Sequence, residues 1–597
     1  MSGPRPEYPR PQFRRAEWQS LNGRWRFAFD DADMGLTAQW QSVSVQTLGA
    51  TGGGPFDREI MVPFAYQAPL SGIGDRSFHD VCWYARSFDA PRVAGAEGLL
   101  LHFGAVDYRA RVWVNGQLVS KHEGGHTPFS ADISGVVRAH DNVLVVRVED
   151  PSEDLTIPRG KQYWKEKSEH IFYTRTTGIW QTVWLEPVPA ARIDTLRLTP
   201  DFDAAAIYLE VGLSGSRPGT RLNVTVTHEG MAVAEARLEG AADTVEHALR
   251  LAAAGGLPLL PWSPESPSLY DLCLELVNAD GGRVDRVESY FGVRKIEARG
   301  GDVYLNDRPY YQRLVLDQGY FPQGILTAPS DADLRRDIEL AKAMGFNGAR
   351  KHQKVEDPRW LYWADRLGFI VWGEMANAYQ FSVAYARRML REWHDVIVRD
   401  YNHPCIVAWV PINESSGIRR NPLAEPQVDH LLALYHVTRS LDRTRLVVSN
   451  DGWEQARTDL CTIHDYSDPA QLLHRFATPR TSLEWPDGAQ AAYCPGHQFS
   501  GEPILVTEFG GIAFGSEAQG AWGYTTVRDE TQFLAQYAAT VDALLQSRCV
   551  RGFCYTQLTD VEQEVNGLLT ADRQPKAELA RIRAITAQDL IEQPLAA

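Results

Sequence analysis

The sequence lacks long apolar segments and any excess of positive charge. No stretch approaches the roughly 18 consecutive apolar residues that span a membrane. The first fifteen residues contain prolines and arginines but no apolar segment, so we expect no secretory signal. The formal net charge is -16, whereas binding to phosphate groups needs a basic face. We therefore expect neither a membrane nor a nucleic acid as partner.

Cysteine is also scarce, and the seven cysteines show no pairing pattern. Their number is odd and no two have the spacing of a metal-binding pair; they are Cys82, Cys273, Cys405, Cys461, Cys494, Cys549 and Cys554. The four at 405, 461, 549 and 554 lie in apolar stretches, which is typical of small buried side chains in a reducing compartment. The cysteine pattern therefore favours a cytoplasmic location.

The length and composition indicate a soluble protein of several domains. A chain of 597 residues exceeds what one core supports, so two to four domains are expected. Hydrophobic residues make up 44% and charged residues 23%, which is ordinary for a globular protein. The 17 tryptophans and 23 tyrosines are plentiful. Most should pack in cores, and the remainder are candidates for stacking on the apolar faces of sugar rings.

The first half of the chain has the pattern of antiparallel β-structure. Residues 99–124 alternate apolar and polar side chains, and Asn115-Gly116 between them predicts a tight hairpin turn. No convincing helix occurs before about residue 190, which predicts a jelly-roll-like β-sandwich over residues 1–188. Turns recur at intervals of roughly ten residues from 189 to 297, as in an immunoglobulin-like sandwich.

After residue 300 short apolar strands alternate with amphipathic helices, which indicates parallel β/α units. The clearest helix has Ser330 as N-cap, Asp333 at the third helical position and Gly345 beyond its end. Eight strands in about 300 residues predict a (β/α)8 barrel over residues 298–597. The predicted strands are Arg313–Asp317, Phe346–His352, Phe369–Glu374, Ile406–Glu414, Leu446–Asp451, Leu460–Tyr466, Ile504–Glu508 and Arg551–Gln557.

Two of these strands run from an apolar body into a single glutamate. "IVAWVPINESSG" ends strand four at Glu414, and "ILVTEFGG" ends strand seven at Glu508. The carboxyl ends of barrel strands share one rim, so the two carboxylates should face each other across it. Acetal hydrolysis needs such a pair, with a gap near 5 Å for retention and about 6.5–9.5 Å for inversion of configuration. Asn413, beside Glu414, could bind the sugar hydroxyl next to the reacting carbon.

The other strand ends supply candidate substrate-binding residues. Arg350 could keep Glu508 ionised, and His352 could bind a hydroxyl. A long insertion in the first domain, with Tyr163 and Trp164, could reach over the barrel mouth. The remaining candidates at the rim are Glu374, Asp451, Trp453, His464, Tyr466 and Tyr555.

The chain resembles glycoside hydrolase family 2, the retaining family that contains β-galactosidases, β-glucuronidases and β-mannosidases. The resemblance rests on the two glutamate motifs and on the order of "LNGRWRF", "VDYRARVWVNG", "HEGGHTPFSADIS", "TTGIWQTVWLEP", "WSPESPSLYDL" and "FGVRKIE". It implies that Glu414 is the general acid/base and Glu508 the nucleophile of an exo-acting enzyme that cleaves a terminal β-linked sugar. It implies a glycoside or oligosaccharide substrate, no cofactor, and a homo-oligomer as one option.

The sugar is less well defined than the reaction. Glucuronidases of the family resemble one another in an Asn-x-Lys pair near the last strand, and this chain reads Asn566-Gly567-Leu568, which disfavours a glucuronide. The Asn-Arg-His run of the galactosidases and the Gly-x-Asn-Trp run of the mannosidases are also absent after strand one. A galactose-like glycone is the leading expectation. Activity of the β-galactofuranosidase or α-L-arabinosidase type is the alternative.

Two other classes of function compete with this interpretation. A non-catalytic carbohydrate-binding protein would be expected to have lost one of the two glutamates, and both are present. A metal-dependent barrel hydrolase could use His352, Glu374, His464 and Asp465 as ligands. No His-x-His pair occurs on strand one, which disfavours this alternative. The resemblance places a family metal site near the Asn-Arg-His run, which is absent here, so we expect no required metal.

Overall fold

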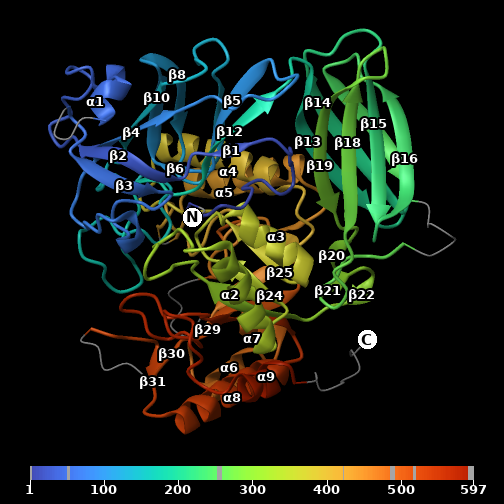
Figure 1. The fold of residues 1–597 in the computed structure, drawn as a ribbon. Coiled ribbons are helices and arrows are strands. Elements are labelled where there is room, and N and C mark those ends of the chain that lie inside the picture. Colours follow the sequence, from blue (N-terminus) through green and yellow to red (C-terminus); the bar gives the residue numbers. More distant parts are fainter. Residues whose placement is uncertain are drawn as a thin grey trace.

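Two β-sandwiches lie beside each other on one side of a parallel β/α barrel (Figure 1). The computed structural model describes residues 3–49, 54–251, 259–420, 422–484, 491–514 and 520–588. Both sandwiches and the barrel are the three units expected from the sequence. The limits predicted for the domains remain a prediction; the one at 297/298 falls inside the short strand β20 (Ile296–Arg299).

The first sandwich packs a four-stranded sheet, in the order β1-β12-β5-β9, with a six-stranded sheet, in the order β3-β2-β4-β10-β7-β8. Its apolar side chains alternate along the strands and form one core between the sheets. Asn115 and Gly116 form the turn between β7 and β8, with φ of 52° and 80°, which confirms the predicted hairpin. The strands are β1 (Gln19–Ser20), β2 (Gly23–Phe29), β3 (Arg58–Val62), β4 (Val81–Phe88), β5 (Gly98–Phe103), β6 (Val106–Asp107), β7 (Arg109–Val114), β8 (Gln117–Glu123), β9 (Phe129–Asp132), β10 (Asn142–Glu149), β11 (Gly178–Ile179) and β12 (Val183–Val188).

The expectation that no helix forms before residue 190 is wrong at one place. A single turn, α1 (Val45–Gly49), forms in the connection between β2 and β3. It has no buried residue, so it lacks the apolar periodicity by which a helix is recognised in sequence.

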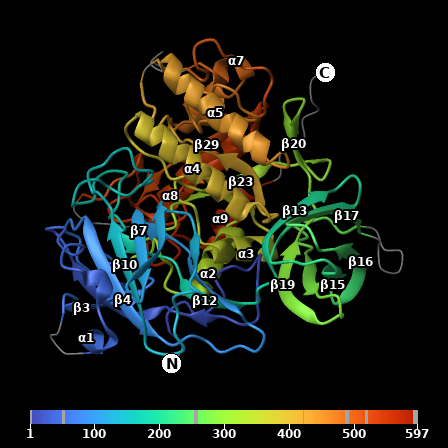
Figure 2. The same cartoon turned by 90° about the horizontal axis from the view of Figure 1, so that it is seen from above.

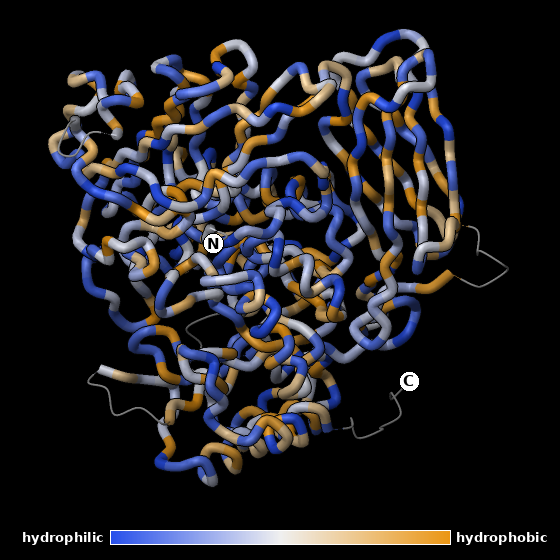
Figure 3. Tube along the Cα trace, in the orientation of Figure 1, coloured by the Kyte–Doolittle hydropathy of each residue, from blue (hydrophilic) through white to orange (hydrophobic). Residues whose placement is uncertain are grey.

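The second sandwich has a three-stranded sheet, β13-β14-β17, packed on a four-stranded sheet, β16-β15-β18-β19. This division into three and four strands is that of an immunoglobulin constant-type domain. Apolar and polar residues alternate along these strands (Figure 3). The strands are β13 (Arg192–Asp201), β14 (Ala206–Ser214), β15 (Arg221–His228), β16 (Met231–Glu239), β17 (Thr244–Arg250), β18 (Tyr270–Val277) and β19 (Arg283–Phe291); a small sheet of β20, β21 (Asp302–Leu305) and β22 (Arg308–Pro309) follows.

The barrel contains eight parallel strands in the order β27-β26-β25-β24-β23-β32-β29-β28, which is the strand order of a (β/α)8 barrel. β27 and β28 are joined through Asp459 and not by strand pairing. The Asp459 carboxylate accepts a hydrogen bond from Val447 N, and Asp459 N donates to Val447 O. The strands are β23 (Gln312–Asp317), β24 (Gly348–Lys351), β25 (Ile370–Glu374), β26 (Ile406–Val410), β27 (Leu446–Val447), β28 (Cys461–His464), β29 (Ile504–Gly510) and β32 (Val550–Thr556), and β30 (Ile512–Ala513) pairs with β31 (Thr525–Thr526) outside the barrel sheet.

The helices lie around this sheet (Figures 1 and 2). In α2, the Ser330 side chain accepts from Asp333 N and the chain passes into Gly345 with φ of 93°, as predicted. Within the described residues no helix is long and apolar enough to cross a membrane. The helices are α2 (Asp331–Ala343), α3 (Pro358–Leu367), α4 (Val383–Asp400), α5 (Glu425–Leu441), α6 (Pro469–Arg475), α7 (Pro479–Ser482), α8 (Glu530–Leu545) and α9 (Leu579–Thr586).

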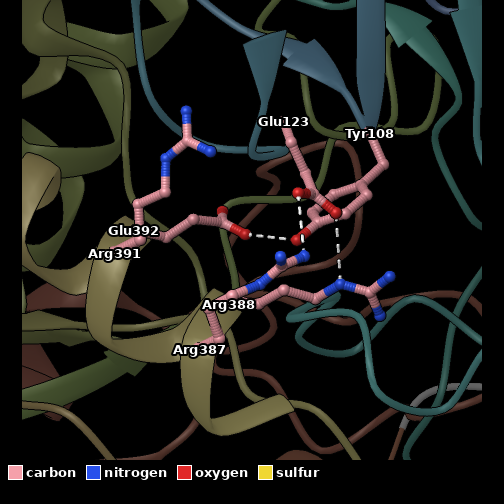
Figure 4. Close-up of a pocket in the computed structure, with 6 residues that line it drawn as sticks. All are labelled: Tyr108, Glu123, Arg387, Arg388, Arg391 and Glu392. Carbon is pink, nitrogen blue, oxygen red and sulfur yellow. Dashed lines mark hydrogen bonds and ion pairs between the residues drawn. The ribbon is translucent and has the colours of Figure 1, made fainter. Parts of the chain in front are cut away.

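The first sandwich is fixed to the barrel through α4. Tyr108 donates to Glu392 Oε1 at 2.9 Å, and Arg388 donates to Glu123 Oε1 at 3.3 Å (Figure 4). These groups line a cavity of about 80 Å³ between the two units. Arg388 also donates to Asp154 Oδ2 at 2.9 Å, so α4 contacts the long connection of the first domain, residues 150–177, as well.

Candidate active site

Arg350, at the end of β24, is the centre of a buried cluster at the carboxyl ends of the barrel strands. Its side chain is fully buried, and Nη1 donates to Glu374 Oε2 at 2.9 Å and to Asn413 Oδ1 at 3.0 Å. The same guanidinium pairs with Asp451 through Nη1 and with Glu508 through Nη2. Four of the other predicted site residues, from four different strand ends, thus meet at the Arg350 guanidinium.

Glu508 is held as a carboxylate. Burial alone would raise its pKa, but the charges of His464 and Arg350 outweigh burial and lower the pKa of Glu508 to about 2. Tyr466 adds a hydrogen bond, with its hydroxyl donating to Glu508 Oε2 at 2.7 Å. An ionised carboxylate of this kind is suited to act as a nucleophile.

An irregularity in β29 brings two consecutive side chains into the cluster. The register with β28 shifts at His464, which lies opposite Glu508, and the register with β32 shifts as well. Thr507 donates to Asp451 Oδ1 at 3.0 Å while the next side chain, Glu508, meets Arg350. A regular strand would point these neighbours to opposite faces, so the bulge delivers both to the barrel mouth.

Glu414 faces Glu508 across His464. His464 Nδ1 lies 2.8 Å from Glu414 Oε1 and 3.5 Å from Glu508 Oε2, and the nearest oxygens of the two carboxylates are within 4.8 Å of each other. His464 Nε2 lies 2.9 Å from Asp451 Oδ2. Although burial opposes the charge, Glu508 and Asp451 raise the pKa of His464 to about 10, so it is an imidazolium between carboxylates.

The backbone at Glu414 is fixed in an unusual conformation. Glu414 and Ser415 both adopt left-handed φ, 49° and 52°, which side chains other than glycine rarely do. Asn450 Oδ1 accepts from Ser415 N, and Ser415 Oγ donates to Glu454 at 2.9 Å. These bonds turn the chain after the strand so that the Glu414 carboxylate, about one-fifth exposed, lines the mouth.

Glu374 and His352 form a second layer beside Arg350. His352 Nδ1 lies 3.0 Å from Glu374 Oε1, which also accepts from Gln353 N at 2.9 Å. Burial raises the pKa of Glu374 to about 7, with Arg350 opposing. Burial, with the charges of Lys161 and Arg350, lowers the pKa of His352 well below its usual range, so His352 is neutral.

The remaining two candidates differ in their placement. Trp453, two residues after Asp451, is half-buried, with the Arg419 guanidinium 4.4 Å above its ring. Tyr555 does not reach the site: its ring packs on Phe509 and on Tyr537 of α8, outside the barrel sheet. Strand alternation explains this, because the next residue, Thr556, is the one whose hydroxyl meets Tyr466 at 3.1 Å.

The structure also brings in residues that strand ends could not reveal. The first-domain insertion does reach the mouth, where Trp164 and Phe172 pack on Tyr379, with ring centroids 4.8 Å and 5.1 Å apart. Tyr524 stacks on Tyr466 at 3.4 Å. The aromatic residues of the insertion were the sequence signal for the contacts of Trp164 and Phe172, and Tyr524 had no such signal.

The alternative of a four-ligand metal site does not match the geometry. Asp465 turns away from the mouth and pairs with Arg475 of α6 at 2.6 Å. Glu414, His464 and Glu508 are close enough to ligate an ion, but both ring nitrogens of His464 already face carboxylates. A charged imidazolium has no lone pair for a metal.

Comparison with protein families gives three matches that follow one another along the chain. Residues 18–189 match the profile "Glycosyl hydrolases family 2, sugar binding domain". Residues 191–294 match "Glycosyl hydrolases family 2", and residues 327–589 match "Glycosyl hydrolases family 2, TIM barrel domain". The three matches cover most of the chain in the order of its two sandwiches and barrel.

Individual relatives include two kinds of enzyme. The chain is 26% identical to a β-galactosidase of Vibrio cholerae over 77% of its own length, but spans only 46% of that protein. It is 24% identical to a β-glucuronidase of Paenibacillus borealis over 95% of its own length and 96% of the relative. A solved β-glucuronidase from Ruminococcus gnavus in complex with D-glucuronic acid shares the fold, with a TM-score of 0.76, 20% identity and coverage of 97% and 99%.

Proposed function

The chain belongs to glycoside hydrolase family 2 and is a glycosyl hydrolase, and we propose that it removes a terminal β-linked sugar by an exo-acting, retaining double displacement. The observation that carries the proposal is that the nearest carboxylate oxygens of Glu414 and Glu508 lie within 4.8 Å of each other. Retaining enzymes hold their carboxyl groups about 5–5.5 Å apart, whereas inverting enzymes need room for a water between them.

In the first step, Glu508 attacks the anomeric carbon and the bond to the leaving oxygen breaks. Glu414 gives that oxygen a proton, so the products are a free alcohol and a glycosyl ester of Glu508. Arg350 and the Tyr466 hydroxyl keep the nucleophile ionised and fix its orientation. Asn413 binds the sugar hydroxyl next to the reacting carbon. Its Nδ2 can donate to that hydroxyl, because none of the described residues accepts a hydrogen bond from Nδ2.

In the second step, Glu414 takes a proton from a water, and the resulting hydroxide attacks the anomeric carbon and releases Glu508. The imidazolium of His464 contacts Glu414 Oε1 at 2.8 Å and orients the carboxylate for this proton transfer. Because His464 also lies near Glu508, it reduces the repulsion between the two carboxylates when both are ionised.

For the glycone, we propose a galactose-like hexose. The β-galactosidase relatives and the missing lysine at Leu568 support this choice. A glucuronide is the second candidate. It is favoured by the Paenibacillus β-glucuronidase, which matches over nearly its whole length, whereas the chain spans about half or less of several other relatives.

The mechanism is tested by product stereochemistry and by Glu414→Ala. Nuclear magnetic resonance of the first product should show the β-anomer. With a dinitrophenyl glycoside, which needs no acid for departure, Glu414→Ala should form the ester but hydrolyse it about 100- to 10,000-fold more slowly. Azide should restore turnover and yield the β-glycosyl azide. An α-anomer as first product, or turnover by Glu508→Gln, would refute the assignment.

A further inference from the structure

Lys161 is a largely buried lysine whose ammonium reaches solvent and has no partner among the described residues. Its side chain is 7% exposed, and among the described residues none accepts a hydrogen bond from its ammonium or forms an ion pair with it. The centroid of the Phe172 ring lies 5.9 Å from Lys161 Nζ. An ammonium that is open to solvent and has no acceptor in the chain keeps all three of its donors for an anionic group of a ligand.

The backbone around Lys161 is fixed against the barrel mouth. Gly160 N donates to Asn377 O at 2.9 Å, and the Tyr379 hydroxyl donates to Gly160 O at 2.6 Å. Tyr173 N donates to Lys161 O at 2.9 Å from the other side. At Gly160, with φ of 62°, a Cβ would lie 2.1 Å from Gln353 O, so only glycine allows this close approach. These contacts between the first domain and the barrel therefore fix the backbone of Lys161 beside the mouth.

The groups near the ammonium belong to the site described above. The charge of Lys161 acts on His352 and on the nucleophile Glu508. It also acts on Glu564, a buried carboxylate that accepts from the Tyr173 hydroxyl at 2.5 Å and from Asn566 Nδ2 at 3.0 Å. Both Glu564 oxygens are thus bonded elsewhere, and neither pairs with the lysine.

We propose that Lys161 is a specificity-determining residue of the glycone subsite and binds the C6 carboxylate of a hexuronic acid, in gluco or galacto configuration. The inference rests on the proposed function and refines its sugar, since a galactose-like ring with an oxidised C6 is a galacturonide. An ammonium has three donors and no acceptor, so an anion complements it better than a hydroxymethyl group does.

The single positive charge of Lys161 favours a carboxylate over a phosphate. One unpaired cation balances one negative charge, whereas a phosphate ester carries nearly two and would leave the excess facing Glu564 and Glu508. Burial raises the pKa of Glu564 above its usual range, with Lys161 opposing.

The test compares substrates that differ only at C6. Nitrophenyl β-glucuronide is paired with β-glucoside, and β-galacturonide with β-galactoside, for the wild type, Lys161→Met and Lys161→Arg. Lys167→Met is the control, because Lys167 is an exposed lysine of the same insertion. The wild type should prefer one uronide over its neutral partner. Lys161→Met should lower kcat/KM for that uronide about 100-fold, mainly through KM, and change the neutral substrate less than 3-fold. Lys161→Arg should retain part of the preference, and Lys167→Met all of it.

A binding measurement keeps the inference testable if none of the four glycosides is cleaved. Free glucuronate or galacturonate should raise the unfolding temperature of the wild type but not of Lys161→Met, while glucose and galactose should not. A wild type that prefers neutral sugars, or a Lys161→Met variant that loses both members of a pair equally, overturns the role of Lys161 and leaves the double displacement intact. Loss of the double displacement would instead be seen with Glu414→Ala and Glu508→Gln.

Discussion

The hydrogen bond from Tyr466 to Glu508 gives a quantitative test of how the nucleophile is held. Tyr466→Phe removes one hydroxyl, which donates to Glu508 Oε2 at 2.7 Å, and keeps the ring stacked on Tyr524 at 3.4 Å. A hydrogen bond to a charged group contributes about 1.5–3 kcal/mol. At about 1.4 kcal/mol for each factor of ten, the loss corresponds to about 10- to 150-fold. The bond strengthens as Glu508 leaves the glycosyl ester as a carboxylate, so hydrolysis of the ester should slow by this factor.

The assay separates the two chemical steps. With a dinitrophenyl glycoside, hydrolysis of the ester limits kcat, and a burst of dinitrophenol should precede a steady rate about 10- to 150-fold below that of the wild type. Tyr524→Phe is the matched control, since that hydroxyl makes no hydrogen bond to Glu508, and its kcat should change less than 3-fold. A Tyr466→Phe enzyme within 3-fold of the wild type, or equal losses in both variants, would refute the reasoning.

Three further predictions concern the cluster and its domain contact. Arg350→Met leaves Asp451 and Glu508 buried without their shared cation, so the free energy of unfolding should fall by about 3–5 kcal/mol, measured by denaturant titration. The raised pKa of His464 means that its contribution to stability is complete below pH 6.5 and is lost as pH rises through about 10; the stability difference between wild type and His464→Gln should therefore be largest at pH 6 and close by pH 10. Gly160→Ala should displace the insertion and lower kcat/KM by about 100-fold, while Gly135→Ala, a site with open space around it, should leave kcat/KM unchanged.

The sequence by itself determined the class of fold and the two reacting carboxylates. Alternation with a period of two residues through the first half and the change to β/α units after residue 300 are local patterns. Each can be recognised within one strand or helix, whatever segments pack against it. Glu414 and Glu508 could be paired from sequence, because parallel strands of a barrel end at one rim whatever their separation along the chain.

Tertiary structure decided which side chains share that rim. Strand alternation in space directs Tyr555 outward, and a bulge in β29 directs both Thr507 and Glu508 inward, although each simply ends a strand in the sequence. The left-handed backbone at Glu414 depends on bonds from Ser415 to distant residues, which local propensity opposes.

The glycone subsite shows the limit most clearly. The glucuronidase pattern has a lysine two residues after the asparagine that follows the last strand, and here Leu568 stands at that place, fully buried. The cation at the mouth is Lys161, about 350 residues before Glu508, and it arrives through the contact of the first domain with the barrel. Local sequence encodes periodicity and burial, whereas the meeting of segments so far apart depends on how whole domains pack, and only the folded chain supplies that.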